Sequence, residues 1–315
     1  MRNTFSFDLH THLNEKKFKA STYWERVLEI GLDGTAITEH ADFRPKEAYE
    51  ELLAEKPEGK LLVPGIEINS DKGHILAYSH SPEIYEIEEF MKKDVPLEDV
   101  IRLGRENNIM ICISHPMGFS NDSLGFFFDA KDVEDMIIKN KLGVEVYNGM
   151  IGHLSNFIYD SAWIRRPRNF LSFLEKNIVS RKMRLSKIGS KLGGKIDEKS
   201  LEVVNRCASA IELGNIADFV VAGSDAHSAE RIGSGMIKIR HRDMELDEGE
   251  LLRSLRNKEN IVWSGPLVRE TSPGVFEKIE DPLKKMEIAQ GLRYATTKVI
   301  REKNPLKRLR REKKE

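Results

Sequence analysis

Several residue types and segments are scarce or absent in this 315-residue chain, and each absence excludes a class of protein. The two cysteines, Cys112 and Cys207, cannot form a disulfide framework, and neither has the spacing of a cysteine-based metal site. No apolar run approaches the roughly 18 residues that a membrane span requires. The first eight residues lack the basic stretch and apolar block of a secretory signal. These absences predict a cytoplasmic protein with no membrane attachment.

The charge of the chain is nearly balanced in total, at −1, but it is uneven along the sequence. Residues 163–206 hold 12 basic and 4 acidic side chains, and residues 284–315 hold the same numbers. The rest of the chain holds 26 basic and 43 acidic side chains, a net charge of −17. At 40% hydrophobic residues the chain can build a large core. The sequence therefore predicts an acidic globular body with two basic appendages.

Short β-rich runs alternate with longer amphipathic segments over most of the chain. The expected strands are residues 5–10, 35–38, 61–68, 74–78, 110–114, 144–147 and 219–222, with 236–239 and 261–263 as later candidates. The expected helices are residues 21–31, capped by Ser21, and residues 45–55, 97–108 and 130–140. This alternation predicts parallel β/α units. Polar residues cluster at the ends of many strands, which favours a closed or distorted barrel over an open sheet.

Two regions interrupt the alternation. Residues 153–195 are basic and helical in pattern, and we interpret them as an insertion into a barrel formed by residues 1–265. Residues 266–315 form a basic C-terminal extension that ends in a run of lysines and arginines.

The nine histidines of the chain lie mostly where a predicted strand ends. The first strand finishes with His10 and His12, and alternate residues of a strand point to the same side. Other histidines and carboxylates follow or flank five further strands. The full set of candidate metal ligands is His10, His12, His40, Glu67, His74, His115, Asp225 and His227.

Any one of these side chains alone would be explained by a structural histidine or a helix-capping aspartate. Packing gives no reason for eight imidazole and carboxylate groups beside six separate strands, because buried charge is costly unless it is paired or bound to metal. Neutral imidazoles and carboxylates are the ligands of Zn, Mn or Fe, and one carboxylate can bridge two ions.

The order of these motifs resembles the PHP superfamily, which is named for its polymerase and histidinol phosphatase members. The resemblance spans residues 5 to about 240. It rests on Asp8-Leu9-His10-Thr11-His12, Ile37-Thr38-Glu39-His40, Gly65-Ile66-Glu67, His74-Ile75-Leu76, His115-Pro116, Val144-Glu145-Val146-Tyr147-Asn148-Gly149 and Gly223-Ser224-Asp225-Ala226-His227. It implies an α/β fold, a distorted (β/α)7 TIM-like barrel with two to three divalent metal ions at its mouth. It also implies a metal-dependent phosphoesterase, a phosphoric ester hydrolase.

The resemblance implies a ligand set for each ion. One ion would bind His10, His12, Glu67 and Asp225. Glu67 would bridge to a second ion held by His74 and His115, and a third ion would involve His40 and His227. The family usually has an Asp or His five or six residues after the second histidine of the first strand, whereas this chain has Lys17 and Phe18 there. The third site is therefore weak, empty, completed by water, or completed by a nearby group such as Glu15.

Ions at these residues would serve the hydrolysis of a phosphate ester. We expect a hydroxide bridging the ions at Glu67 to be the nucleophile. His40 or His227, where not committed to a third ion, would protonate the leaving oxygen. The predicted catalytic residues are therefore Glu67, His40 and His227.

The substrate is less well indicated by the sequence. Relatives acting on nucleotides or on nucleic-acid 5′ ends often carry an Arg soon after the His-Pro pair, where this chain has Met117-Gly118-Phe119. The basic insertion would then bind phosphate, through Arg165, Arg166, Arg168, Arg181 and Arg184. The alternative is that these charges are simply the solvated face of a helix. The same choice, RNA or DNA binding against solubility, applies to the tail.

Four functions remain open from the sequence. The first is a phosphoesterase acting on a nucleotide or a nucleic-acid 5′ end, and the second is a phosphomonoesterase for a small metabolite such as histidinol phosphate. A hydrolase of C–N bonds agrees less well with the order of the motifs. A catalytically degenerate barrel that binds nucleic acid or protein is supported by Lys17 and opposed by the otherwise full ligand set.

Overall fold

The computed structural model describes residues 3–118, 121–152, 208–242, 246–264, 268–272 and 275–278, together with the single residues 169 and 194. Nearly all of these belong to one of the chain's two units, which comprises residues 1–152 and 202–280. The fold described below is that of this unit. Most of the expected insertion and the end of the expected extension lie outside the described residues.

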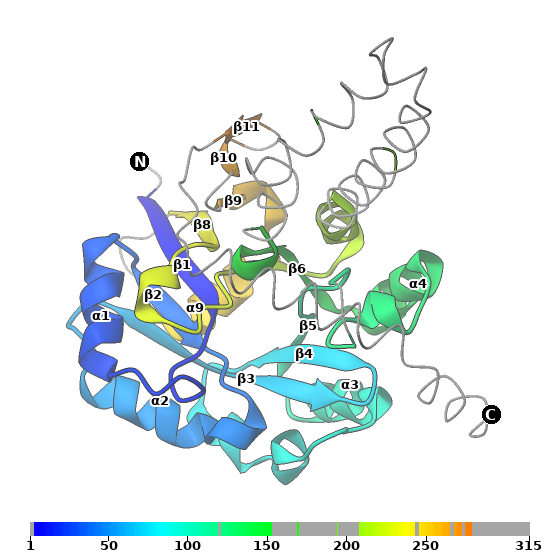
Figure 1. Cartoon of the computed structure of the whole chain (residues 1–315), viewed down its shortest axis with the longest axis horizontal. Helices are drawn as coiled ribbons and strands as arrows, with labels where there is room; N and C mark the ends of the chain where they lie inside the picture. Colours follow the sequence, from blue (N-terminus) through cyan, green and yellow to red (C-terminus); the bar gives the residue numbers. More distant parts are fainter. Residues whose placement is uncertain are drawn as a thin grey trace, which may run out of the picture. The chain divides into compact units, whose positions relative to one another are not determined.

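The described strands form one 11-stranded sheet in the order β11-β10-β9-β8-β1-β2-β3-β4-β5-β6-β7 (Figure 1). Their bounds are β1 (Asn3–Thr11), β2 (Gly34–Ile37), β3 (Leu61–Ser70), β4 (Gly73–Tyr78), β5 (Met110–Ile113), β6 (Gly143–Asn148), β7 (Val220–Gly223), β8 (Met236–His241), β9 (Ile261–Ser264), β10 (Val268–Ser272) and β11 (Val275–Lys278). Strands β8 to β11 pair antiparallel in succession outward from β1, so that β10 and β11 extend the sheet beyond residue 265.

The sheet from β1 to β7 curves until its two ends nearly meet. Just past β7, the backbone N–H of Asp225 donates to the His10 carbonyl at 2.8 Å, and the N–H of His12 donates to the Ala226 carbonyl at 3.1 Å. Gly223 permits this approach, since a Cβ there would lie 2.2 Å from the His10 Cβ. The predicted α/β class and barrel-like sheet are confirmed.

One part of the barrel differs from the predicted series of parallel β/α units. Strand β4 pairs antiparallel with both β3 and β5. Only Asp71 and Lys72 separate β3 from β4, and two residues can close a hairpin but cannot form a crossover helix. The exception matters for the site, because β3 and β4 bring Glu67 and His74 together from adjacent strands.

Helices cover the outside of this sheet (Figure 1). The α-helices of the described residues include α1 (Ala20–Glu29), α2 (Pro45–Ala54), α3 (Leu97–Glu106), α4 (Ala130–Asn140) and α9 (Glu248–Ser254). The first four lie within two residues of the predicted bounds. The predicted cap of α1 is wrong, because Ser21 lies inside the helix and Lys19 precedes it without a side-chain cap.

Short 3-10 helices connect several strands: η1 (Ala41–Phe43), η2 (Pro82–Glu86), η3 (Glu88–Met91), η4 (Leu124–Phe126), η5 (Ala229–Arg231) and η6 (Lys258–Asn260). In α1 the buried residues are Ala20, Tyr23, Trp24 and Val27, at the spacing of one helix face. They join a core that continues through the buried residues of β1 to β7. None of the helices in the described ranges combines the length and apolar character that a membrane span needs.

Candidate metal centre

The eight predicted ligands come from six strands and meet at one end of the barrel. His10 and His12 lie at the end of β1, and Glu67 and His74 lie in β3 and β4. His40 follows β2, His115 follows β5, and Asp225 and His227 follow β7. His10, His12 and Glu67 have side chains at most 2% exposed, whereas His40, His74 and His227 are 13%, 25% and 20% exposed. The cluster thus has a buried floor and a rim open to solvent.

Glu67 lies at the centre of this cluster. Its Oε2 is 3.2 Å from the Nε2 of His10, 3.3 Å from that of His12 and 3.2 Å from that of His40. Its Oε1 is 3.1 Å from His74 Nδ1 and 3.2 Å from His115 Nε2, and it accepts a hydrogen bond from Ser114. Each carboxylate oxygen therefore faces its own group of imidazoles, as a carboxylate that bridges two ions would.

Asp225 completes the group on the Oε2 side of Glu67. Its Oδ1 is 3.7 Å from His10 Nε2 and 3.4 Å from His12 Nε2. Donor atoms of His10, His12, Glu67 and Asp225 all lie within 4.8 Å of one another, and the same holds for His40, Glu67 and His74. Both groups mix imidazole nitrogen with carboxylate oxygen, the donor set of Zn, Mn and Fe sites. The structure therefore contains His/Glu/Asp groups able to bind metal.

A second layer of acceptors fixes the ring orientation of most of these histidines. The Nδ1–H of His10 donates to Glu145 at 2.8 Å, and that of His12 points at Glu39 at 3.3 Å. The Nδ1–H groups of His40 and His227 donate to the backbone carbonyls of Glu67 and Asp225, at 3.3 and 2.9 Å. Because Nδ1 carries the proton in these rings, Nε2 presents a lone pair to the cluster when the ring is neutral.

His115 is oriented by a hydroxyl in the same way. Ser123 donates its own proton to Asp122 at 3.1 Å, so its oxygen is an acceptor for the Nδ1–H of His115, also at 3.1 Å. The Nε2 of His115 then faces Glu67. His74 is the exception, because its Nδ1 is the atom that faces Glu67.

The inward lone pairs supply the test of whether a metal fits this cluster. The Nε2 atoms of His10 and His12 are buried, and neither has a hydrogen-bond partner among the described residues. A buried nitrogen without a partner costs about 1–3 kcal/mol. Both nitrogens lie beside carboxylate oxygens, which cannot donate a proton to them. A cation between the nitrogens and the carboxylates would satisfy both, so the residues fit a metal.

The charges of the cluster are strongly coupled. Burial lowers the pKa of His10, but Glu145, Glu67 and Asp225 outweigh it and raise the pKa well above the usual value. The pKa of His115 is raised to about 9 despite burial, chiefly through its hydrogen bond to Glu67. Burial alone would raise the pKa of Glu67, yet the surrounding histidines hold it well below normal. Without metal, the site therefore retains protons where a cation would otherwise bind.

Two of the predicted ligands have strained backbones. His115 has φ 27° and Asp225 has φ 53°, the left-handed region that non-glycine residues rarely adopt. Hydrogen bonds hold both: the N–H of His115 donates to Glu145 at 2.7 Å, and the N–H of Asp225 donates to the His10 carbonyl at 2.8 Å. Strain of this kind is concentrated at functional sites.

Several residues that the structure brings to this site have no role predicted from the sequence. Glu145 and Glu39 orient His10 and His12, and Asn148 donates to both Glu145 and Asp225. Glu145 and Asn148 belong to the strand motif 144–149 that supported the resemblance, and Glu39 directly precedes His40. Only the position of these residues in the motifs could have indicated them.

Glu15 and Lys17 occupy opposite environments at the rim. The Oε2 of Glu15 is 2.7 Å from His227 Nε2, and donor atoms of His12, Glu15 and His40 lie within 4.8 Å of one another. Lys17 is exposed. The arginines predicted to bind substrate, Arg165, Arg166, Arg168, Arg181 and Arg184, all lie outside the described residues.

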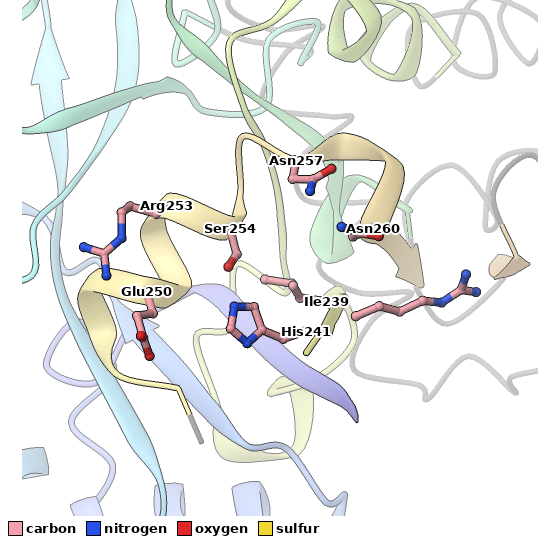
Figure 2. Close-up of a pocket in the computed structure, with 8 residues that line it drawn as sticks. Ile239, His241, Glu250, Arg253, Ser254, Asn257 and Asn260 are labelled. Atoms are coloured by element: carbon pink, nitrogen blue, oxygen red, sulfur yellow. The ribbon is translucent and has the colours of Figure 1, made fainter. Parts of the chain in front are cut away.

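A separate cavity of about 330 Å³ lies away from the cluster, between β8 and α9 (Figure 2). Its lining is Ile239, Arg240, His241, Glu250, Arg253, Ser254, Asn257 and Asn260. None of the eight predicted ligands lines it, so the cavity and the cluster are separate features of the fold.

Comparison with known proteins agrees with the resemblance. A family model described as PHP-associated matches residues 219–260, a segment that includes β7, Asp225 and His227. This match supports membership of the PHP superfamily. No curated protein matches the chain.

Two solved structures are similar to this chain at low identity. One is a two-domain protein from Bacteroides vulgatus containing a predicted PHP-like metal-dependent phosphoesterase, with 15% identity, a TM-score of 0.47 and coverage of 84% of this chain. This chain spans 65% of that protein, less than two thirds of it. The other is PsfC from Pseudomonas syringae, with 13% identity, a TM-score of 0.49 and coverage of 94% of this chain and 99% of PsfC.

Proposed function

We propose that this chain, whose motifs and PHP-associated segment support membership of the PHP superfamily, is a metal-dependent phosphoesterase. The observation that carries the proposal is the surrounding of Glu67, whose two oxygens face two separate groups of imidazoles within 3.3 Å. As a bridge, this carboxylate can share one cation with the neutral rings of His10 and His12 and a second with those of His74 and His115.

The proposed cofactor is two to three divalent ions of Zn, Mn or Fe. Such ions supply Lewis acidity toward phosphoryl oxygens and lower the pKa of a bound water toward neutrality. His10, His12, Glu67 and Asp225 would hold one ion. Glu67, His74 and His115 would hold the second.

The buried and the partly exposed histidines would have different roles in catalysis. His10 and His12 are fully buried, and Glu145 and Glu39 fix their rings, so they serve to hold an ion in place. His40 and His227 are partly exposed, at 13% and 20%, on the side of the cluster that the leaving oxygen of an ester would approach. Either of them would donate the proton to that oxygen unless both are committed to a further ion.

For the substrate, we propose a nucleotide or the 5′ end of a nucleic acid. The support is the charge of the sequence: residues 163–206 and 284–315 each carry 12 basic and 4 acidic side chains, against an acidic remainder. Two cationic segments on an otherwise anionic chain favour a polyanionic substrate, and binding to it would weaken steeply with salt.

The test is metal analysis followed by hydrolysis. We expect two or three Mn or Zn ions per purified chain by mass spectrometry, and hydrolysis of phosphate esters in a panel of generic mono- and diesters, nucleotides, histidinol phosphate and 5′-phosphorylated RNA and DNA. Less than one ion per chain and no turnover with added Mn or Zn would contradict the enzyme and leave a degenerate binding barrel. Preference for histidinol phosphate would contradict the nucleotide assignment alone.

Variants at the rim and the floor test the division of roles. His115→Ala should abolish turnover and lower the metal content, because it removes a ligand of the second ion. Where one of the two rim histidines is the general acid, its alanine variant, His40→Ala or His227→Ala, should lower turnover by about 100-fold or more. Where both hold a further ion, both variants should lower the metal content as well. Asp42→Asn is a matched control at the same rim, since Asp42 pairs with Lys93 and not with the cluster. Full turnover in both rim variants would show that neither histidine donates the proton.

A further inference from the structure

Glu15, in the loop after β1, is a half-buried carboxylate that the two ions at Glu67 do not require. We infer that Glu15 is a ligand of a third divalent ion, together with His40 and His227, and that it supplies the donor that Lys17 cannot. The inference rests on the metal site of the proposed function and extends it to a residue outside the resemblance's ligand set.

The position of the carboxylate is the first argument. Glu15 Oε2 is 2.7 Å from His227 Nε2, and a Glu15 oxygen lies within 4.8 Å of the donor nitrogens of His12 and His40. Donors that share one Zn ion, each about 2.0–2.1 Å from it, lie roughly 3 Å apart. The Glu15 side chain is 15% exposed and that of His227 is 20% exposed, so both groups are largely withdrawn from water.

The orientation of the two histidines is the second argument. His227 donates its Nδ1–H to the Asp225 carbonyl, and His40 directs its Nδ1–H to the Glu67 carbonyl. Carbonyls only accept, so a neutral ring in either position has its lone pair on Nε2. The Nε2 of His227 then points a lone pair at the carboxylate of Glu15, an arrangement that is repulsive unless a positive charge lies between them. A proton on Nε2 would supply that charge in an ion pair, and a divalent ion held by both groups would supply it in a metal site; the two donors of His227 and Glu15 are close enough for either.

The loop is fixed in a way that turns Glu15 inward. The backbone N–H groups of Leu13 and Asn14 donate to Glu39 at 2.8 and 2.6 Å, the same carboxylate that orients His12. The N–H of Lys17 then closes a turn onto the Asn14 carbonyl at 3.2 Å, and Lys17 is exposed with φ 55°. Lys16 pairs with Oε1 of Glu15, which leaves Oε2 to face His227. Two imidazoles and one carboxylate form a donor set for Zn, Mn or Fe.

The test is a titration with Co²⁺, followed by its visible absorption and by the metal content of the full-length protein after desalting. We expect wild type to bind three Co²⁺ per chain and Glu15→Gln to bind two, with the two tighter ions unchanged. Glu15→His should regain the third ion, because imidazole is also a ligand. Asp42→Asn, which removes a carboxylate paired with Lys93 at the same rim, should retain three.

Several results would overturn the inference. They are saturation of wild type at two ions, retention of three ions by Glu15→Gln, loss of all ions from Glu15→Gln, and failure of Glu15→His to regain the third. An ion pair between Glu15 and His227 without metal predicts the first of these. Thermal unfolding of the metal-free variants reports whether each one folds. Ester hydrolysis is measured separately, so absence of turnover with the expected stoichiometry would refute the proposed function and not the ligand.

Discussion

Glu145 is a buried carboxylate that orients two of the predicted metal ligands, His10 and His115. Its oxygens accept hydrogen bonds from four described donors, which are the ring of His10, the hydroxyl of Ser114, the backbone N–H of His115 and the amide of Asn148. Glu145 thereby links His10 in β1 to His115, which follows β5. The same contact holds His115 in its left-handed backbone conformation. The position of two ligands therefore depends on one side chain behind them.

Glu145→Gln should weaken metal binding by about 10- to 100-fold, as loss of such an outer partner usually does. The Gln amide would set a donor against the donors of His10 or His115, whereas the carboxylate only accepts. Competition with a chromophoric chelator measures the affinity. Glu47→Gln is the control, because Glu47 is exposed and pairs with Arg44. Equal affinities for the Glu145 variant and wild type would refute the positioning role.

At the scale of elements, closure of the barrel between β1 and β7 brings the first and the last of the metal-ligand motifs together. Asp8 of β1 accepts the backbone N–H of Ser224 at 2.8 Å and that of Gly233 at 2.7 Å, so it joins β1 to the segment after β7. Burial raises the pKa of Asp8 to about 6, and these hydrogen bonds limit the rise. Gly223 leaves room for His10 where β1 meets β7, a contact that we call the seam. The seam therefore places Asp225 beside His10 and His12.

Gly223→Ala should destabilise the protein by about 1–3 kcal/mol, the range of overpacking, since the new Cβ meets the backbone and Cβ of His10. It should also lower metal affinity, because His10 must shift to make room. Gly249→Ala is the matched control: Gly249 lies in α9, the nearest atoms to its new Cβ would be side-chain ends of Arg253 and Asp247 at 3.3 Å, and alanine favours helix. Chemical denaturation measures both. Equal stability of the two variants would show that the seam can relax.

At the scale of the whole molecule, the proposed metal ions and protons would compete for the same histidine nitrogens. In the metal-free protein the pKa of His115 is about 9, above its usual 6.5. A raised histidine pKa contributes stability that is fully present below pH 6.5 and is lost as the pH rises through 9. In the metal-loaded protein the rings are neutral ligands, so metal binding strengthens over the same interval.

The difference in melting temperature between metal-loaded and chelator-treated protein should therefore widen from pH 6.5 to 9. Thermal unfolding with Mn²⁺ or with chelator, at steps of pH, measures this difference. Asp8, whose pKa is raised to about 6, titrates in both the metal-loaded and the chelator-treated protein. Its effect on melting temperature therefore cancels in the difference between them. A difference that stays constant or narrows as the pH rises would contradict a cluster in which cations replace protons.

The sequence by itself predicted strands β1 to β9, helices α1 to α4 and all eight candidate ligands, because periodicity and the place of polar residues after apolar runs are local properties. It did not predict α9, β10 or β11. It did not give the antiparallel place of β4, since pairing direction depends on a two-residue connection and on distant partners. It left Glu15 as one of several alternatives and gave Glu145 no role.

Only the tertiary structure decided how those residues act together. It placed Glu67 between two groups of imidazoles, turned Glu15 toward His227 while Lys17 faces solvent, and put Glu145 behind His10 and His115. These relations join residues up to 212 positions apart in sequence, between Glu15 and His227, and depend on barrel closure and hydrogen-bond direction. Local sequence sets which side chain is available, and packing sets which atom of it meets which partner.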